Sequence, residues 1–552
     1  MTPGPRGRRA VVVGLVLVAI VTLAGIGLAV ARFGDRTPRV AAGPPRFVDE
    51  AAAAGLDHVY DGGTTFYVGG GLAVFDCDDD GREDLYVAGG SNPARLYRNE
   101  SATGGALRFV AVSDPATDLP AVNGAYPLDI DGDGFIDLAV LRVGENVLLR
   151  GLGDCRFERA NEAWSFDGGT AWTTAFSATW EGSAGLPTLA IGRYRALEAD
   201  GGATLECAPN ALVRPAASGN AYAPPVALGP GYCTLSMLSS DWDRSGRRDL
   251  RVSNDRNYYG TDGEEQLWRM EPGGTPRLYT QDDGWVRVQV EGMGIASHDL
   301  TDDGLPEVYL TSQGDNKLQT LTAGPDEPAY RDIGLRRGVN AAQPFTGGEA
   351  LPSTAWHPEF DDVNNDGFID LFVSKGNVKA QPGYALRDPS NLLLGRPDGT
   401  FVEAADAAGV LSFARGRGAA LVDFNLDGLL DLVEVNLGDP IGLWRNLGTG
   451  APDPGHWLAI ELRQAGPNRD AIGAWLEIRV GDAMIRREIV VGGGHASGAL
   501  GWTHVGLGPA GTAAVRVQWP DGEIGPWQDV DADQFVTVER GAAGPRAWLP
   551  PD

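Results

Sequence analysis

The chain has 552 residues, of which 78 are glycine, and it carries a formal net charge of −29. That length is enough for two or more domains, and the abundant glycine with few long helical patterns favours an all-β protein rich in turns. The charge argues against nucleic acid as a partner, because phosphate backbones are bound by basic patches.

The first element along the chain is an uncharged apolar run over residues 10–31, preceded by three arginines. Its length suffices to cross a bilayer as a helix. We therefore expect an uncleaved signal anchor with a transmembrane helix in residues 1–36, followed by a Pro/Gly/Ala linker over 37–45. Cleavage after Ala29–Ala31, which would release a secreted protein, stays open. Either way, the bulk of the chain is expected outside the cytoplasm, in the first case as a single-pass protein of the cell membrane.

The stretch Asp129–Arg142, DIDGDGFIDLAVLR, organises the rest of the chain. Alternate carboxylates in a tight loop can converge on one hard cation, and ligands that are all oxygen suit Ca²⁺. Gly134 permits the positive φ of a sharp turn, and a short apolar strand follows. An EF-hand has a bidentate Glu at position 12, where this chain has Val140. Here Asp137, at position 9, closes the loop instead.

This loop recurs with starts about 51 to 63 residues apart, and we number its copies loop 1 to loop 7. Loop 3, which begins at Trp180, has no carboxylate at the expected positions and is predicted to be empty. Loop 5 has Thr301 and Glu307 as substitutions. We predict about four to six structural Ca²⁺ ions; the alternative is turn-forming residues without metal. The candidate ligands at positions 1, 3, 5 and 9 are Asp76, Asp78, Asp80 and Asp84 in loop 1; Asp129, Asp131, Asp133 and Asp137 in loop 2; Asp241, Asp243, Ser245 and Asp249 in loop 4; Asp299 and Asp303 in loop 5; Asp362, Asn364, Asp366 and Asp370 in loop 6; and Asp423, Asn425, Asp427 and Asp431 in loop 7.

A repeat of this length with several short strands per unit indicates a four-stranded propeller blade. Seven units predict a seven-bladed β-propeller over residues 46–450. No further strand follows Trp444, whereas Phe47–Glu50 precedes loop 1. We predict that this N-terminal strand completes the last blade and closes the ring, which leaves no open sheet edge.

Residues 451–545 are predicted to form a small β-sandwich. Alternation such as Leu476, Ile478 and Val480 gives each strand one buried face, and Asp521-Gly522 is a hairpin signal. The expected strands are 457–462, 474–480, 484–491, 513–519 and 535–540.

The acidic loops, each after a short apolar strand, resemble FG-GAP/VCBS repeats, as in the integrin α-subunit propeller. Residues 456–540 resemble the ASPIC/UnbV domain through Asn468–Ala474, Val505–Gly508 and Val517–Gly522. This layout is similar to that of the cartilage acidic protein family. The resemblance implies calcium-bound blades and an extracytoplasmic binding role, without implying a reaction. Gly492–His504 departs from the usual family pattern.

The four cysteines do not have the spacing of a zinc site. In an oxidising compartment a Cys207–Cys233 disulfide is expected, whereas Cys77 and Cys155 could be free or paired.

His495 and His504 could form a metal or acid–base pair, or be histidines without chemistry. Core packing is expected for the aromatic residues of the irregular blades, with ligand binding in a central funnel as the alternative; these residues are Trp172, Trp180, Tyr258 and Tyr259.

The chain has no recognisable catalytic motif. We predict a membrane-tethered, extracytoplasmic calcium-binding propeller that binds a protein or glycan and is not an enzyme. Inserts at Cys207–Tyr232 and Gln381–Asn391 would give specificity, because loops on a rigid scaffold carry function. The alternative is an extracytoplasmic enzyme, glycan-acting or accessory to natural-product biosynthesis, that uses acidic residues of the funnel.

Overall fold

The computed structural model describes residues 40–198, 202–255, 263–451 and 455–550. The prediction of an all-β protein is confirmed. The only α-helices in these ranges are the single turns α2 (Ala51–Ala54), α3 (Gly334–Arg337) and α4 (Ala405–Ala408). None of the described helices could span a membrane; the predicted helix in residues 1–36 lies outside the described ranges.

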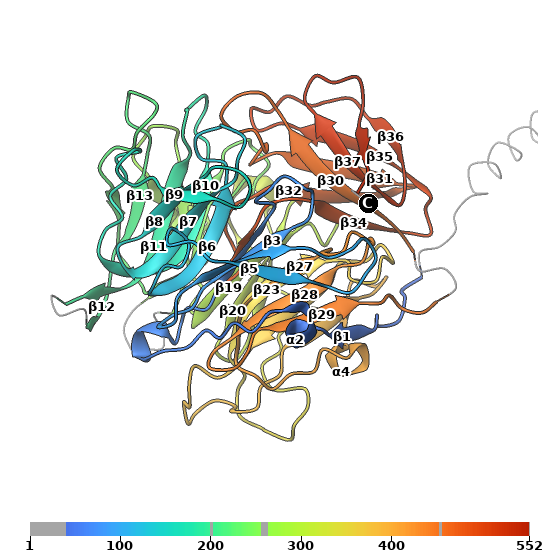
Figure 1. The fold of residues 1–552 in the computed structure, drawn as a ribbon, viewed down its shortest axis with the longest axis horizontal. Helices are drawn as coiled ribbons and strands as arrows, with labels where there is room; N and C mark the ends of the chain where they lie inside the picture. Colours follow the sequence, from blue (N-terminus) through green and yellow to red (C-terminus); the bar gives the residue numbers. More distant parts are fainter. Residues whose placement is uncertain (1–39, 199–201, 256–262, 452–454, 551–552) are drawn as a thin grey trace, which may run out of the picture. The chain divides into compact units, whose positions relative to one another are not determined.

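Seven antiparallel units of four strands follow one another along the chain (Figure 1). Their strands are β2 (Leu72–Phe75), β3 (Asp84–Val87), β4 (Arg95–Asn99) and β5 (Phe109–Val112) in unit 1; β6 (Val122–Leu128), β7 (Asp137–Gly144), β8 (Val147–Gly151) and β9 (Phe157–Arg159) in unit 2; β10 (Ala171–Thr179), β11 (Thr188–Leu197), β13 (Asn210–Val213) and β14 (Val226–Leu228) in unit 3; β15 (Thr234–Ser240), β16 (Asp249–Asn254), β17 (Gln266–Arg269) and β18 (Arg277–Leu278) in unit 4; β19 (Gly292–His298), β20 (Glu307–Ser312), β21 (Lys317–Leu321) and β22 (Tyr330–Asp332) in unit 5; β23 (Ala355–Asp361), β24 (Asp370–Lys375), β25 (Asn391–Gly395) and β26 (Phe401–Glu403) in unit 6; and β27 (Gly416–Val422), β28 (Asp431–Asn436), β29 (Gly442–Asn446) and β1 (Phe47–Asp49) in unit 7. Units 2 and 3 are joined by pairing of β7 with β10, and β12 (Ala203–Cys207) pairs with β11.

The two ends of this array meet. Strand β1 pairs with β29, with Phe47 opposite Asn446 and Asp49 opposite Trp444. The first strands of the units contact one another in the order β2, β6, β10, β15, β19, β23, β27 and back to β2. The chain therefore forms a closed circuit, and its N-terminal strand completes the last unit as predicted.

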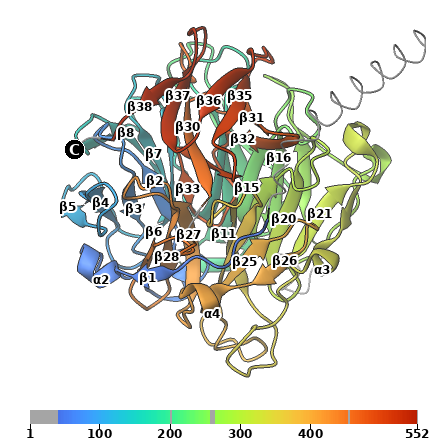
Figure 2. The same cartoon turned by 90° about the vertical axis from the view of Figure 1, so that its right-hand side faces the viewer.

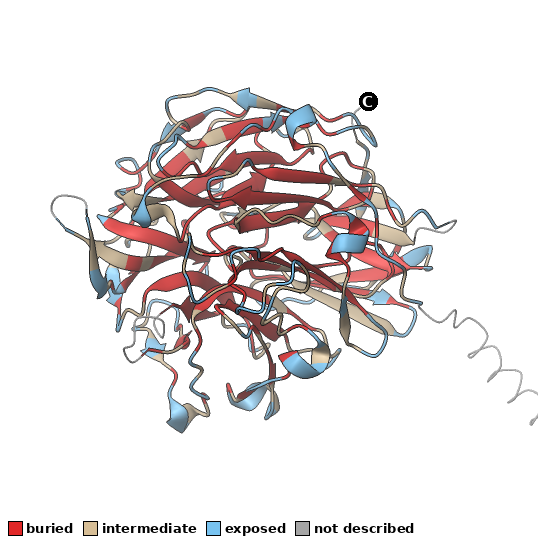
Figure 3. Ribbon diagram, turned by 90° about the horizontal axis from the view of Figure 1, so that it is seen from below, coloured by how far each residue is buried: buried red, intermediate tan, exposed pale blue. Residues whose placement is uncertain are grey.

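The first strands of the units are buried almost along their whole length, and Figure 3 shows the buried strands in red in the interior. Strand β2, LAVF, packs between neighbouring units and exposes none of its side chains. Two buried faces explain why β2 is continuous in apolar residues instead of alternating.

The prediction of a surface insert in unit 3 is wrong. The segment Cys207–Tyr232 was expected to be a surface insert, but it contains β13, which pairs with β11 and lies in the third position of unit 3. Strand β14 then pairs with β13. The usual sequence signature of a third strand is absent here, so this part of the blade could not be recognised from its residues.

The C-terminal region consists of two four-stranded sheets (Figure 2). One has the order β34 (Thr503–Gly508), β30 (His456–Arg463), β37 (Gln534–Glu539), β38 (Arg546–Trp548); the other has β32 (Ala483–Glu488), β31 (Trp475–Val480), β35 (Thr512–Gln518), β36 (Gln528–Asp531). Side chains of both sheets, such as Ile460 on β30 and Ile478 on β31, share one apolar core. Strand β38 lies just past the predicted end of the domain at residue 545.

Strand β32 ends at Glu488, three residues earlier than predicted, because the next segment leaves the sheet. Residues 489–501, which we call the plug, run against the first strands of several units. Within the plug, β33 (Gly498–Ala499) pairs in parallel with β2, and bridges join Val491 to Ala178 and Gly494 to Ile295. The plug therefore lies inside the circuit of first strands.

Close approach explains the glycines on both sides of this contact. A Cβ atom at Gly71 would lie 1.8 Å from the carbonyl oxygen of Ala496, and one at Gly494 would lie 2.4 Å from the His357 ring. Neither position can accept a larger residue without a shift of the backbone or the ring.

An aromatic cluster fills a further part of the interior. Trp172, Tyr194 and Trp356 pack together with Val68 and Met293. Trp172 and Trp180 are both buried, which confirms the packing expected for them; Tyr258 and Tyr259 lie outside the described residues. The axis of the circuit is thus occupied by side chains and by the plug.

Candidate cation-binding loops

Each acidic loop connects the first and second strands of its unit, and its position 9 residue begins the second strand. All six acidic loops share two backbone features. Position 6 is a glycine with φ between +81° and +102°, and position 4 also has positive φ, even where it is Arg244 or Leu426. Left-handed backbone at a residue other than glycine costs free energy, so the surrounding hydrogen bonds must hold these turns.

Those hydrogen bonds come from the loop acids. The position 6 amide donates to the position 1 carboxylate in all six loops, for example from Gly81 to Asp76 at 2.7 Å and from Gly428 to Asp423 at 2.7 Å. The position 1 acid therefore folds the loop around itself, whether or not a metal is bound.

In loops 1, 2, 6 and 7 the carboxylate at position 9 is held in place by two backbone amides. In loop 6, Asp370 accepts hydrogen bonds from the amides of Val363 and Gly395, at 3.0 and 2.8 Å. The same pair of backbone donors, position 2 and the third strand, serves the position 9 acids of loops 1, 2 and 7. Two donors leave acceptor capacity on each carboxylate.

In loops 1 and 2 the acids converge. One oxygen each from Asp76, Asp78 and Asp84 lie within 4.8 Å of one another, as do oxygens of the acids at the same positions 1, 3 and 9 of loop 2. Burial raises the pKa of Asp76 to about 6 and that of Asp129 to about 6. The carboxylates are thus costly to ionise without a cation.

Loops 6 and 7 are the most buried. The four candidate ligands of loop 6 are each at most 5% exposed. In loop 7, Asn425 is fully buried and its Oδ1 has no hydrogen-bond partner among the described residues. Burial raises the pKa of Asp423 to about 8, with the Asp427 carboxylate adding to the shift. An orphaned amide oxygen beside buried carboxylates fits an oxygen-binding cation.

Arginines contact the acids of several loops. In loop 2, Arg150 of β8 lies 2.8 Å from Asp131 and 2.7 Å from Asp133. In loop 4, Arg247 donates to Asp249 and lies 3.4 Å from Asp243. In loop 5, Arg486 from the C-terminal region donates to Asp299 at 2.7 Å. None of these roles was predicted from the sequence. Position 7 of loop 1 is also an arginine, Arg82, so residue type alone does not reveal this role.

The C-terminal region rests on the acidic loops. The indole of Trp502 donates to the carbonyl of Gly81 in loop 1 at 3.1 Å, and Arg469 donates to that of Gly134 in loop 2. In loop 6, the Asn365 carbonyl accepts from the amide of Gly508 at 3.1 Å. A change in the conformation of these loops would therefore disturb the hydrogen bonds that hold the C-terminal sheets against the repeat units.

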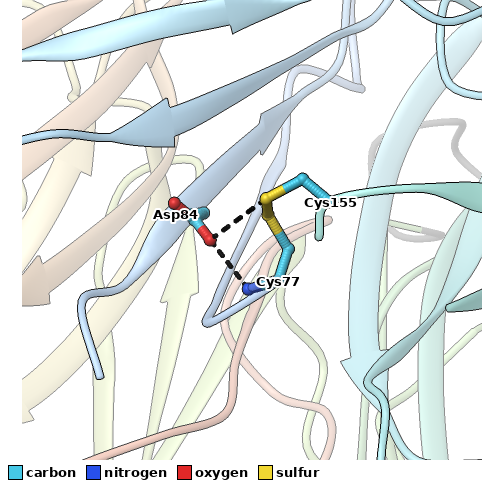
Figure 4. A group of neighbouring side chains, drawn as sticks. All are labelled: Cys77, Asp84 and Cys155. Atoms are coloured by element: carbon cyan, nitrogen blue, oxygen red, sulfur yellow. Dashed lines mark hydrogen bonds between the residues drawn. A yellow bond between two sulfur atoms is a disulfide. The ribbon is translucent and has the colours of Figure 1, made fainter. Parts of the chain in front are cut away.

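Both cysteine pairs form disulfides. The predicted Cys207–Cys233 bond is confirmed, and Cys77, left open by the sequence, is bonded to Cys155. Figure 4 shows this second bond beside Asp84, whose Oδ2 accepts from the Cys77 amide at 2.7 Å. Since both sulfurs are in a disulfide, they are not thiolate ligands. The disulfide instead links position 2 of loop 1 to Cys155 in unit 2.

The histidines proposed as a pair have separate partners. The amide of His495 donates to Nδ1 of His357 at 3.0 Å, whereas Nε2 of His504 bonds to Oδ1 of Asn365 at 2.7 Å. Burial lowers the pKa of His495 to about 3 and that of His504 to about 4. Both imidazoles are therefore neutral at pH 7.

A cavity of about 280 Å³ separates the plug and β32 from the first strands of the later units. Its lining includes His298, His357, Glu359 and His504. His357 lies 3.5 Å from Glu359. No sequence signal could have found this group, because its members come from separate units and the C-terminal region.

Comparison with known families adds to this geometry. A model of FG-GAP-like repeats matches residues 76–140 and 362–434, and a model described as ASPIC and UnbV matches residues 464–545. The chain is similar to cartilage acidic protein 1. It is 24% identical to the Mus musculus protein over 489 residues, which cover 82% of this chain and 71% of the relative. These matches confirm the resemblance inferred from the loops.

The match to cartilage acidic protein 1 of Homo sapiens is shorter. It has 24% identity over 236 residues, 39% of this chain, and spans 32% of that relative's length. Among solved structures, BBS1N in complex with ARL6DN aligns with a TM-score of 0.42 and 10% identity, covering 74% of this chain and 99% of that one. A similarity at that level supports no conclusion about this chain.

Proposed function

We propose that this chain is a seven-bladed β-propeller with a C-terminal β-sandwich, in which Ca²⁺ ions in loops 1, 2, 6 and 7 act as structural clamps. The observation that carries the proposal is the buried, unpartnered Oδ1 of Asn425 among the carboxylates of loop 7, as found within the described residues. Leaving such a group unsatisfied costs about 1–3 kcal/mol, and a bound cation removes that cost. Oxygen-only ligands favour Ca²⁺ over zinc or copper.

We place the protein outside the cytoplasm, held at the membrane by its N-terminal segment. Two disulfides support this location, because disulfides persist in oxidising compartments. The alternative of a protein released by signal cleavage shares the same chemistry.

The role we propose is binding of a protein or glycan through the loops away from the C-terminal sheets. Figure 1 shows the yellow loops on the side of the ring opposite the red sheets. Leu351 and Leu386 are exposed at 40% and 55%, and the two segments that carry them are in contact, since the amide of Leu386 donates to Glu349 at 3.0 Å. Exposed apolar side chains on a rigid scaffold suit an interaction surface.

The enzyme alternative depended on an acidic funnel. The plug and the cluster around Trp356 fill part of that space, and a cavity of about 280 Å³ lined by Glu359, Asp361 and Glu488 remains beside the plug. We prefer the interaction role because no catalytic motif accompanies these acids.

Thermal unfolding with millimolar Ca²⁺ and with excess chelator tests the clamps. Several sites that bind only the folded state should raise the midpoint by many degrees, and metal analysis should find about four Ca²⁺ ions per chain, one for each proposed loop. An unchanged midpoint with no bound metal would refute the proposal. For the binding role, a glycan array and a cross-linking screen with wild type and the L351D/L386D variant should show signals that the variant loses.

A further inference from the structure

Loop 4 differs from the other acidic loops in its charge. Its nine residues, DWDRSGRRD, contain three aspartates and three arginines. Loops 2, 5, 6 and 7 contain no basic residue of their own, and loop 1 contains one. Loop 2 is contacted from outside by Arg150 of β8, which reaches positions 3 and 5 but not position 9. The backbone of loop 4 nevertheless has the shared form, with positive φ at Arg244 and Gly246. The difference therefore lies in the side chains.

The position 9 carboxylate of loop 4 is saturated with donors. Asp249 accepts from Nε and Nη2 of Arg247 at 2.9 and 3.2 Å, from the indole of Trp242 at 2.9 Å and from the hydroxyl of Tyr279 at 2.8 Å. The amide of Met270 adds a donor at 2.9 Å. A carboxylate has about four lone-pair sites, so none remains for a metal.

The same guanidinium reaches position 3. Nη2 of Arg247 lies 3.4 Å from Oδ2 of Asp243. The acids at positions 1, 3 and 9 converge within 4.8 Å in loops 1 and 2. Among the described residues, the acids of loops 4, 6 and 7 form no such group, so what distinguishes loop 4 is its arginine contact and not the spacing of its acids.

Loop 1 offers a matched comparison. Arg82 also stands at position 7, but its Nε donates to the carbonyl of Ser101 at 2.9 Å, and its Nη1 lies 3.3 Å from Asp80 at position 5. The position 9 acid of this loop, Asp84, accepts from the backbone amides of Cys77 and Asn99. The direction of the arginine side chain thus separates two loops with the same residue at the same position.

We propose that Arg247 is a built-in cation that takes the place of Ca²⁺ in loop 4, so that this loop is held without metal. This inference rests on the proposed calcium function of the other loops. A monovalent guanidinium that bridges positions 3 and 9 supplies the positive charge and the donors that the carboxylates need. Loop 4 then stays ordered when calcium is withdrawn.

Calcium content of the full-length chain, measured by metal analysis after gel filtration, tests this assignment. Asp249→Asn should leave the number of bound ions unchanged, whereas Asp370→Asn in loop 6 should remove one. Arg247→Ala should add one ion, and Arg82→Ala, the matched control, should add none. The added ion should disappear when Arg247→Ala is combined with Asp249→Asn.

The outcomes separate the two proposals. No bound calcium in the wild type, with no effect of Asp370→Asn, refutes the proposed function itself. Loss of an ion in Asp249→Asn, with the other loops behaving as expected, overturns only the role of Arg247, as does failure of Arg247→Ala to gain an ion. The Asp249→Asn result keeps the proposal falsifiable if Arg247→Ala fails to fold.

Discussion

Replacing Asp423 with asparagine separates the two roles that a loop acid can have. The carboxylate accepts hydrogen bonds from the amides of Asp427 and Gly428, and it is a proposed Ca²⁺ ligand. Asparagine keeps the shape and one acceptor oxygen but removes the charge and one of the two hydrogen bonds, because the two amides donate to different oxygens; the lost bond costs about 1 kcal/mol. The variant should therefore fold, lose one calcium ion, and be more stable than the wild type without metal, with calcium offsetting most of that gain.

The magnitude follows from the pKa of Asp423. Burial raises it from 3.8 to about 8 in the metal-free protein, so at pH 7 the folded chain holds a proton that the unfolded chain has lost. The raised folded pKa means that stability falls as pH rises from about 4 to about 8. At pH 7 this costs about 4 kcal/mol. The neutral amide of the D423N variant avoids the cost, so in chelator this variant should be the more stable protein.

With calcium the stability advantage of the variant should shrink by a measurable amount. A site filled at a hundredfold excess over its Kd adds about 3 kcal/mol of unfolding free energy. D423N should gain less from calcium than the wild type by that amount. Urea unfolding at pH 7, followed by tryptophan fluorescence with calcium and with chelator, measures both differences.

The control is Asp406→Asn, an exposed aspartate of α4 in the same part of the chain. It should change neither stability nor the calcium increment. If D423N were less stable than the wild type in chelator and gained as much from calcium, the carboxylate would be a turn acceptor and not a ligand, and the reasoning for loop 7 would be wrong.

Three further predictions concern the interior. The lowered pKa values of His495 and His504 mean that below pH 6.5 the unfolded chain binds protons that the folded chain does not. The free energy of unfolding should therefore fall by about 2 kcal/mol per histidine at pH 5. In urea titrations, the H504Q variant should show a shallower dependence of the unfolding free energy on pH. Replacing Cys77 and Cys155 by serine opens a loop of 78 residues and should cost about 4 kcal/mol in non-reducing urea titrations, a difference that should vanish under reduction. Gly71→Ala puts a Cβ against the plug and should cost about 1–3 kcal/mol, with faster proteolysis inside residues 489–501; unchanged proteolysis would argue against the plug contact.

Much of the fold could be predicted because its signals are local. An acidic loop with glycine at position 6, followed by a short strand, repeats along the chain, and this repeat gives the number and order of the units. The closing pair of β1 and β29 could be predicted because one end of the array lacked a strand and the other end had a spare one. The strands around Ile478 alternate strictly, so their positions were also predictable.

Other features depend on contacts between distant segments. The plug has no strand pattern, and its glycines make sense only beside β2 and His357. The third strand of unit 3 has lost its signature, yet pairing with β11 places it in the sheet. In each case the partner, not the local residue pattern, determines the conformation.

The sequence by itself determined the repeat, the closing strand of the ring and the set of candidate oxygen ligands, because the spacing of residues in a tight turn controls which side chains can converge. Only the tertiary structure distinguished Arg82 from Arg247. Both arginines stand at position 7 of an acidic loop, but Arg82 finds a carbonyl acceptor at Ser101, whereas Arg247 turns to Asp249 beside Tyr279. A long, flexible side chain takes its direction from the acceptors packed around it, and those come from parts of the chain that the loop sequence does not contain.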